Sequence, residues 1–250
     1  MSRPLILITN DDGVHAPGIR ALLDAVRDLG ETVIVAPERN NSAISHALTM
    51  NRPLLVTELE KDVHTLDGTP ADSVMLAVNK ILPKKPDLIL SGINAGPNLG
   101  DDISYSGTVA AAIEGAMHGI PSLAFSLAGP PPYSFGAAAV VARKLTGLAL
   151  LRRQSAETIL NINIPPLPTE EIRGFRFTRQ GARHYRDAIQ ETGDPWGRRH
   201  FWIGGGEVLN RSGENTDEQA VNAGYVSITP IQIDMTSIKG LAWLEREWPL

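Results

Sequence analysis

The chain begins with a continuous apolar run, Leu5–Thr9, that ends at the polar sequence Asn-Asp-Asp-Gly of residues 10–13. A run without polar alternation is typical of a strand that is buried on both faces of a parallel sheet. Ligands of open α/β sheets bind just beyond the carboxyl ends of such strands. Two adjacent carboxylates at that place, Asp11 and Asp12, repel each other and resist desolvation unless a cation compensates them. The feature predicts either a hard divalent ion such as Mg²⁺ or Mn²⁺ or an ordinary turn with a helix cap.

Composition narrows the class of protein. The chain has 250 residues, is 42% hydrophobic and contains no cysteine, which excludes disulfides and thiolate metal sites. Its net charge of −5 argues against a nucleic acid polymer as the main partner. We find no signal-peptide pattern and no apolar stretch near the roughly 18–20 residues that span a bilayer. We therefore expect a soluble cytoplasmic protein with no membrane partner.

The periodicity of the first 165 residues indicates alternating strands and helices, as in βαβ units. Each helix is expected to connect strands through a right-handed crossover, which gives an α/β protein with a mainly parallel sheet. The predicted strands are Leu5–Thr9, Thr32–Ala36, Asp87–Leu90, Ser122–Phe125 and Thr158–Ile164, and the predicted helices are Ile19–Leu29, Asp72–Ile81, Thr108–His118 and Phe135–Leu151.

Residues 166–250 have a different character. Phe175–Arg179 and Tyr225–Thr229 alternate as half-buried strands do, and the polar segment 180–219 between them contains Trp196 and Trp202. A structureless loop of that length is improbable on a compact monomer, so we expect a hairpin arm that docks on another subunit. The prediction is a catalytic core over 1–165, followed by strands and an oligomerisation arm over 166–250 that returns to the core as one structural unit.

Two further polar clusters follow predicted strands, at residues 37–42 and 91–102. In a parallel sheet both clusters project to the same edge as Asp11 and Asp12. Their Ser and Asn side chains offer neutral oxygens, which complete an oxygen-rich shell and leave room for water and a phosphate oxygen on a six-coordinate ion. Any single Asn or Ser among them is also an ordinary turn residue.

A third cluster, Ser104–Thr108, precedes a predicted helix and suits a helix N-terminus that binds an anion, although a simple Ser/Thr cap explains it equally well. No GxxxxGK[ST] loop is present and no GxGxxG follows the first strand, which disfavours a nucleoside-triphosphate motor and a dinucleotide dehydrogenase. Phosphatases with an aspartate nucleophile would show two aspartates separated by one intervening residue after the first strand. The adjacent pair here favours a water held by a metal over a covalent aspartyl phosphate.

The remaining candidates are weaker. His46 lies near the expected site edge and is a candidate for a supporting or proton-transfer role only. The segment Gly68–Asp72 is interpreted as a turn into a helix, with Thr69 as the cap and Pro70 at the first helical position. The same turn is also placed to line a substrate pocket.

In combination, these segments resemble the SurE (survival protein E) nucleotidases, and the resemblance covers nearly the whole chain. The matching segments are Asn10–Gly13, Ala36-Pro37 with Ser42, Gly68–Asp72, Ser91–Asn94 with Gly96–Asn98, Ser106–Thr108, Asn161–Pro165, Phe177–Gln180 and Tyr225–Pro230.

The resemblance implies a metal-dependent phosphatase of nucleoside 5′- and 3′-monophosphates. It implies a Rossmann-like three-layer α/β/α core and a C-terminal β-hairpin arm that forms a homodimer or homotetramer. One divalent ion per subunit, Mg²⁺ or Mn²⁺, would activate the attacking water. By this resemblance the metal ligands are Asp11, Asp12, Ser42 and Asn94, the phosphate contacts are Asn98, Ser106, Gly107 and Thr108, and the catalytic set is Asp11, Asp12, Asn98 and Ser106.

One departure is Ala43 with Ser45, in a loop where family members often have glycine. It leaves the expected ligands untouched but bears on loop mobility and substrate preference. Two other functions remain open from the sequence. A metal-dependent deacetylase can also begin with an Asp-Asp pair, but its zinc site usually recruits histidine. A nucleotide-sensing protein that uses the arm for assembly would differ only in lacking activity.

Overall fold

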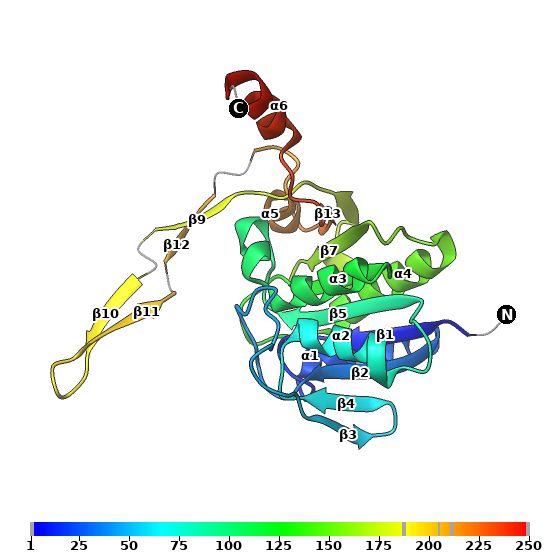
Figure 1. Ribbon diagram of the computed structural model, residues 1–250. Helices are drawn as coiled ribbons and strands as arrows, with labels where there is room; N and C mark the ends of the chain where they lie inside the picture. The colour runs from blue at the N-terminus through cyan, green and yellow to red at the C-terminus, as the bar shows by residue number, and fades with distance from the viewer. Residues whose placement is uncertain (1–2, 187–188, 205, 211–212, 249–250) are drawn as a thin grey trace.

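A single nine-stranded sheet forms the centre of the protein, with strands in the order β3-β4-β2-β1-β5-β6-β7-β13-β8 (Figure 1). The computed structural model describes residues 3–186, 189–204, 206–210 and 213–248. Neighbours from β4 through β7 run parallel, whereas β3 is antiparallel to β4 and β13 is antiparallel to β7. The strands are β1 Leu5–Thr9, β2 Glu31–Pro37, β3 Val56–Glu60, β4 Val63–Leu66, β5 Leu88–Ala95, β6 Ser122–Leu127, β7 Thr158–Ile164, β8 Phe175–Phe177 and β13 Val226–Gln232.

Helices cover both faces of this sheet, which gives the expected three-layer α/β/α core. Ile6 and Ile8 of β1 pack with α1 and α4 on one face, while Leu5 and Leu7 pack with α2 and α3 on the other. Because successive side chains of a strand point to opposite faces, a strand covered on both sides is apolar at every position. The helices are α1 Pro17–Val26, α2 Pro70–Leu76, α3 Gly107–Met117, α4 Gly136–Arg152 and α5 Asp217–Asn222, with a π-helical turn Ala77–Ile81 after α2 and 3₁₀ turns η2 Gly100–Tyr105 and η3 Thr169–Glu171.

The Rossmann-like parallel core predicted from the sequence is confirmed, with two differences. The hairpin of β3 and β4 was not predicted, because the residues of β3 are all exposed and carry no buried periodicity. The strand predicted over 87–90 continues as β5 through Ala95, so Ser91 and Asn94 belong to the strand itself. The register with β6 shifts between these two residues, which hides the end of the strand from a pattern of apolar positions.

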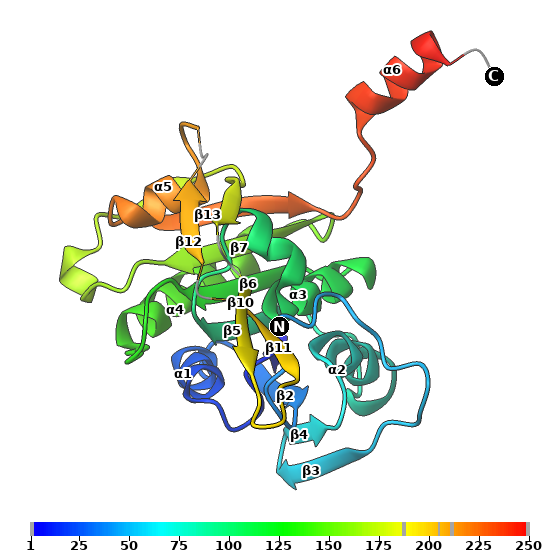
Figure 2. The same cartoon turned by 90° about the vertical axis from the view of Figure 1, so that its left-hand side faces the viewer.

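The predicted arm extends away from the core as two short antiparallel ladders (Figures 1 and 2). β9 (Arg183–Arg186) pairs with β12 (Glu207–Asn210), and β10 (Ile189–Gly193) pairs with β11 (Arg199–Ile203). Large apolar side chains on the outer ladder are exposed, among them Trp202 at 68% and Ile203 at 89%. The arm therefore presents apolar surface to solvent in the single chain.

The helix α6 (Ile238–Glu247) was not predicted from the sequence. An extended segment after β13 connects it to the core, and it projects away from the core (Figure 2). None of its residues is buried, and Ile238, Leu241, Trp243 and Leu244 are exposed. Like the arm, α6 leaves a row of apolar side chains without cover in the monomer.

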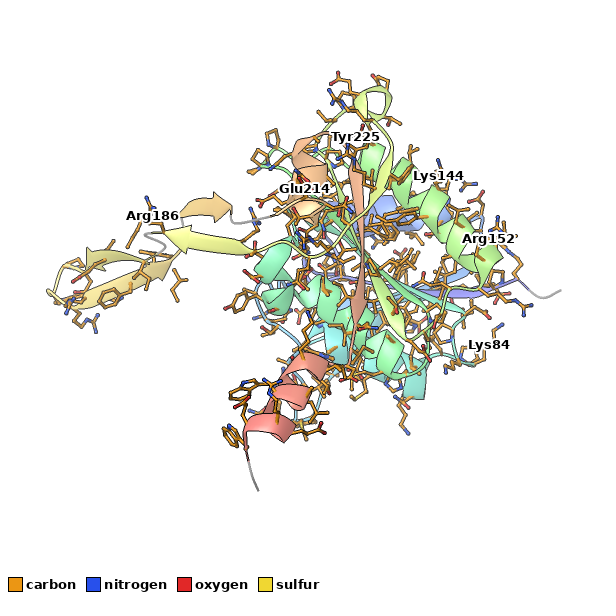
Figure 3. The ribbon with its side chains drawn as sticks, turned by 90° about the horizontal axis from the view of Figure 1, so that it is seen from above. Lys84, Lys144, Arg152, Arg186, Glu214 and Tyr225 are labelled. Atoms are coloured by element: carbon orange, nitrogen blue, oxygen red, sulfur yellow. The ribbon has the colours of Figure 1, made fainter. Side chains whose placement is uncertain are left out.

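Figure 3 shows the charged residues Lys144 and Arg152 of α4 on the side of the core that lies away from the arm, whereas Arg186 lies on the arm itself, at the outer end of β9. None of the helices in the described part of the chain combines the length and apolar character needed to cross a lipid bilayer.

Candidate functional site

The aspartate pair lies at the point of the sheet where the strand order reverses. β1 pairs with β2 on one side and with β5 on the other, and the chain leaves β1 through α1 on one face of the sheet but leaves β5 through α3 on the opposite face. Such a switch point is the usual ligand crevice of an open α/β sheet. Asp11 and Asp12 follow β1 directly and therefore occupy this crevice.

Asp11 is buried against the first turn of α3. The Thr108 hydroxyl donates to Asp11 Oδ1, and a Cβ on Gly107 would lie only 2.7 Å from Asp11 Cβ. Glycine at position 107 thus allows the helix to begin beside the carboxylate. Ser106 is the N-cap and accepts the Val109 N–H at 3.1 Å, as the capping interpretation of the sequence predicts. The first amides of α3 therefore face the crevice beside Asp11.

Burial raises the pKa of Asp11 from its ordinary value of 3.8 to about 6, and the neighbouring Asp12 charge adds to this rise. The Thr108 hydrogen bond opposes it. Burial also raises the pKa of Asp12. Among the residues that the structure describes, none forms an ion pair with either carboxylate. Two desolvated carboxylates without a countercharge fit a bound divalent cation.

Asp12 is held by the two neighbouring strands. The Ala95 N–H at the end of β5 donates to Asp12 Oδ2 at 3.0 Å, and Asn40 Nδ2 approaches Asp12 Oδ1 at 3.4 Å from the loop after β2. Asn40 Oδ1 in turn accepts the Ser42 N–H at 2.7 Å and the Ser42 hydroxyl at 2.6 Å. Ser42 is therefore tied to Asp12 through Asn40, a residue that sequence reasoning did not single out although it belongs to the polar cluster after β2.

Asn94 lies next to Ala95 at the end of β5, and its Nδ2 donates to the Gly96 carbonyl at 3.0 Å. This bond uses the amide nitrogen and leaves Asn94 Oδ1 as a neutral oxygen acceptor. No group of three or more His, Cys, Asp or Glu side chains in the described ranges is arranged to hold a metal. An ion at the aspartate pair therefore needs neutral oxygens such as those of Ser42 and Asn94, or water, to complete its shell.

Asn98 is fixed by polar groups of two other strands. Its backbone N–H donates to Asn163 Oδ1, and its carbonyl accepts from the side chains of Asn161 and Asn163, each at 2.9 Å. Its Nδ2 donates to the Ser126 hydroxyl at 2.8 Å. Sequence reasoning missed these three partners as site residues. The signal for two of them is the Asn-Ile-Asn alternation within β7, which puts two amides on one face of a buried strand.

The loop that carries Asn40 and Ser42 is anchored further along at His46. His46 Nε2 lies 2.8 Å from Glu114 Oε2, and His118 Nε2 lies 3.2 Å from the other oxygen of this buried carboxylate. Glu114 is seven residues beyond Gly107 on α3, which is about two helical turns. The contact therefore gives His46 a supporting role, away from the end of α3 that faces Asp11.

The turn before α2 anchors the same loop. Thr69 caps α2 in a capping box with Asp72, and Pro70 is the first helical residue, as predicted. The Thr69 hydroxyl also donates to the Ala47 carbonyl at 2.8 Å, while Asp72 accepts the Thr49 N–H at 3.0 Å. The turn thus both starts the helix and holds the loop.

Two residues of the loop after β2, Ala43 and Ser45, have an unusual backbone. Ala43 has a φ of 60° and Ser45 a φ of 57°. This left-handed region is one that glycine adopts without steric penalty and other residues rarely do. The Ser45 N–H donates to the Tyr105 carbonyl at 2.9 Å, so the loop reaches η2 from this point.

The root of the arm is bound to η2. The buried Asp217 carboxylate accepts the N–H of Gly100 at 2.8 Å and the N–H of Gly181 at 2.9 Å. Arg183 Nη1 at the start of β9 forms an ion pair of 2.6 Å with Asp102. The short helix that follows Asn98 is thereby fastened to both ends of the arm.

Comparison with known proteins identifies the family of the chain. Residues 6–187 match the family model described as SurE, survival protein SurE. The proteins named 5′-nucleotidase SurE from Geobacter sulfurreducens and Pelobacter propionicus are each 48% identical to the chain. The alignments cover 98% and 93% of this chain and 94% of each relative. The crystal structure of the SurE protein from Aquifex aeolicus superposes with a TM-score of 0.85 at 44% identity, covering 97% of this chain and 100% of the other. The chain belongs to the SurE family.

Proposed function

We propose that this protein is a metal-dependent 5′-nucleotidase that hydrolyses nucleoside 5′-monophosphates, and also 3′-monophosphates, to nucleoside and inorganic phosphate. The names of its relatives support the reaction class over nearly the whole chain. The observation that carries the proposal is the contact between Thr108 and Asp11, which sets a desolvated carboxylate pair against the N-terminus of α3. One crevice thereby offers acidic oxygens for a cation and backbone N–H groups for an anion.

In this proposal Asp11, Asp12, Ser42 and Asn94 hold one divalent ion per subunit. The fit rests on the donor chemistry: two buried carboxylates without a countercharge and two neutral oxygens suit Mg²⁺ or Mn²⁺. When bound, such an ion polarises a phosphate oxygen and lowers the pKa of the attacking water.

The phosphate is bound by groups at the start of α3. The Thr108 hydroxyl is committed to Asp11, so Thr108 and Gly107 contribute their backbone N–H groups. Ser106 uses its oxygen to cap the helix and keeps its hydroxyl hydrogen for a phosphoryl oxygen. Asn98 gives one amide hydrogen to Ser126 and keeps the second. These fixed donors stabilise charge that grows on the phosphoryl oxygens during hydrolysis.

The test is phosphate release from a panel of nucleoside 5′- and 3′-monophosphates after metal removal and after return of Mg²⁺ or Mn²⁺. We expect release only with the ion present, and a loss of at least a hundredfold in Asp11→Asn. Asp24→Asn is the matched control, because Asp24 is exposed on α1, away from the crevice. Folded protein that releases no phosphate with either ion would refute the proposal.

We further propose that the arm and α6 form contacts in a homodimer or homotetramer. The support is the exposed apolar surface on both, including Trp202 and Trp243. Sedimentation that shows only monomer at high concentration would contradict this. The cytoplasmic location stays a prediction.

A further inference from the structure

We propose that a cavity at the same edge of the sheet as the aspartate pair is the subsite for the nucleoside part of the substrate, with Tyr133 as its base-contacting residue. The inference rests on the proposed nucleotidase function and adds where the uncharged part of the substrate binds. The cavity has a volume of about 440 Å³, within the roughly 300–1,000 Å³ typical of small-molecule sites.

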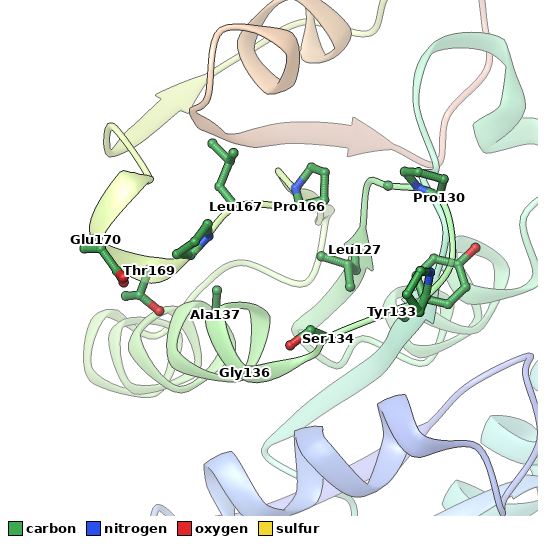
Figure 4. A pocket seen from close by; sticks show the side chains of 13 residues that line it. Leu127, Pro130, Tyr133, Ser134, Gly136, Ala137, Pro166, Leu167, Thr169 and Glu170 are labelled. Carbon is green, nitrogen blue, oxygen red and sulfur yellow. The ribbon is translucent and has the colours of Figure 1, made fainter.

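The cavity lies at the same edge of the sheet as Asp11 and Asp12, two to three strands further along. One wall follows β6 and contains Leu127, Pro130 and Tyr133, and the opposite wall follows β7 and contains Leu167 and Glu170 (Figure 4). The start of α4 closes the space between the walls (Figure 4). Both walls are loops at carboxyl ends of parallel strands, where ligands of such sheets bind.

Backbone contacts connect this cavity to Asp12. Leu127 pairs with Ala95 in the register of β6 and β5, and the Leu127 carbonyl accepts the Gly96 N–H at 3.1 Å. The Ala95 N–H is the donor to Asp12. The successive amides of Ala95 and Gly96 therefore connect Asp12 with Leu127 of the cavity wall.

The hydroxyl of Tyr133, a residue of the cavity wall, and the side chain of the proposed metal ligand Asn94 both lie near Gly96. A methyl group placed on Gly96 would lie 3.9 Å from the Tyr133 hydroxyl and 4.0 Å from Asn94 Nδ2. Tyr133 as a residue is 36% exposed, and its ring centroid lies 6.3 Å from that of Phe135. It therefore offers an accessible aromatic face within reach of a ligand whose phosphate lies at the aspartate pair.

The chemistry of the lining fits a nucleoside rather than a phosphate. Leucine and proline side chains and one aromatic ring provide apolar contact for a flat base, while Ser134, Thr169 and Glu170 offer hydrogen-bond partners to ring edges or sugar hydroxyls. No lysine or arginine is among the described residues that line the cavity. An anionic group is therefore better bound at α3.

A second cavity of about 370 Å³ flanks the other side of the aspartate pair, but its lining is different. It contains Glu38, Arg39, Asn40, Asn41 and Asp67, with Arg52 paired to Asp67 at 2.6 Å. These charged walls offer no aromatic face to a base. The difference in lining favours the cavity that contains Tyr133 as the nucleoside subsite.

The test compares AMP with ribose 5-phosphate, which lacks the base, in the metal-loaded protein. Stacking of a base on an aromatic side chain is lost in Tyr133→Ala, so we expect its KM for AMP to rise roughly tenfold with kcat within about twofold. We expect its kcat/KM for ribose 5-phosphate to change by less than about twofold. Tyr133→Phe keeps the ring and is expected to recover most of the AMP affinity. Phe177→Ala removes an exposed aromatic of the edge strand β8 and is the control.

Two further measurements separate this inference from the proposed function. Leu167→Trp fills the cavity and is expected to raise the KM for AMP without the same effect on ribose 5-phosphate. Adenosine binding to the metal-free protein, followed by calorimetry, is expected for the wild type and weakened at least fivefold in Tyr133→Ala. Three results would each overturn the subsite. The first is an equal loss of kcat/KM for AMP and ribose 5-phosphate in Tyr133→Ala, and the second is an unchanged KM for AMP in folded Tyr133→Ala. The third is no adenosine binding by the wild type. Absence of phosphate release by a wild type that binds adenosine would refute only the nucleotidase function.

Discussion

The Thr108 hydroxyl donates to the Asp11 carboxylate, and this bond joins the first turn of α3 to the end of β1. Thr108→Val keeps the shape of the side chain and removes the donor. Because partners of a metal ligand orient it, we expect metal affinity and kcat/KM to fall by about 10- to 100-fold. Thr108→Ser restores the hydroxyl and is expected to recover most of the loss. Manganese titration of each variant measures the affinity, and wild-type affinity in folded Thr108→Val would contradict the role.

The stability of the metal-free protein is predicted to fall as the pH rises from about 4 to about 6. The folded pKa of Asp11 lies above its ordinary value of 3.8, at about 6, so the folded state holds this proton over that interval and the unfolded state does not. A rise of about two units corresponds to about 3 kcal/mol of lost unfolding free energy above pH 6.

Urea unfolding in EDTA at pH 5 and pH 7.5 measures this effect. Asp11→Asn cannot ionise, so its stability is expected to depend less on pH and to exceed that of the wild type at pH 7.5. Addition of Mg²⁺ or Mn²⁺ is expected to reverse that order, since the ion binds the ionised wild-type pair. If the unfolding free energies of the wild type and of Asp11→Asn depended on pH in the same way, the loss of stability above pH 6 would not arise from Asp11.

Two histidines on one carboxylate allow a controlled test of how the loop with Ser42 is held. His46 and His118 both contact Glu114, but only His46 belongs to that loop. His46→Ala is expected to weaken metal binding about fivefold or more, because it frees the loop from α3. His118→Ala removes a similar contact and is expected to leave metal affinity within about twofold. Equal effects of the two variants on metal affinity would show that the contact between His46 and Glu114 does not support metal binding by holding the loop.

Asp217→Ala is predicted to destabilise the protein by about 2–4 kcal/mol. The change leaves the N–H groups of Gly100 and Gly181 without their acceptor, and an unsatisfied buried group costs about 1–3 kcal/mol. Chemical denaturation measures this loss. Asp234→Ala, on the exposed stretch before α6, is the control and is expected to change stability by less than about 0.5 kcal/mol.

Much of the core was predictable because its signals are local. The apolar run of β1 reflects cover on both faces, and the position of Asp11 and Asp12 follows from where that run stops. The start of α2 was predictable for the same reason, since Thr69, Pro70 and Asp72 form a cap within four residues. Such features depend on neighbours in the sequence.

The parts that were missed depend on residues far apart in the chain. The bonds of Asn98 to Asn161 and Asn163 span 63 and 65 residues and require the order of β5, β6 and β7 to be known. The exposed strand β3 and the uncovered helix α6 lack the burial that gives a pattern its period. The contact of His46 with Glu114 likewise exists only because the loop folds over α3.

The first strand of the arm, β9, contacts η2 through Arg183, and the helix that follows the arm, α5, contacts η2 through Asp217. The segment of η2 begins two residues after Asn98. The attachment of the arm and the proposed phosphate contact Asn98 therefore share one short stretch of backbone, so a substitution that loosens the arm at Arg183 or Asp217 also alters the surroundings of Asn98.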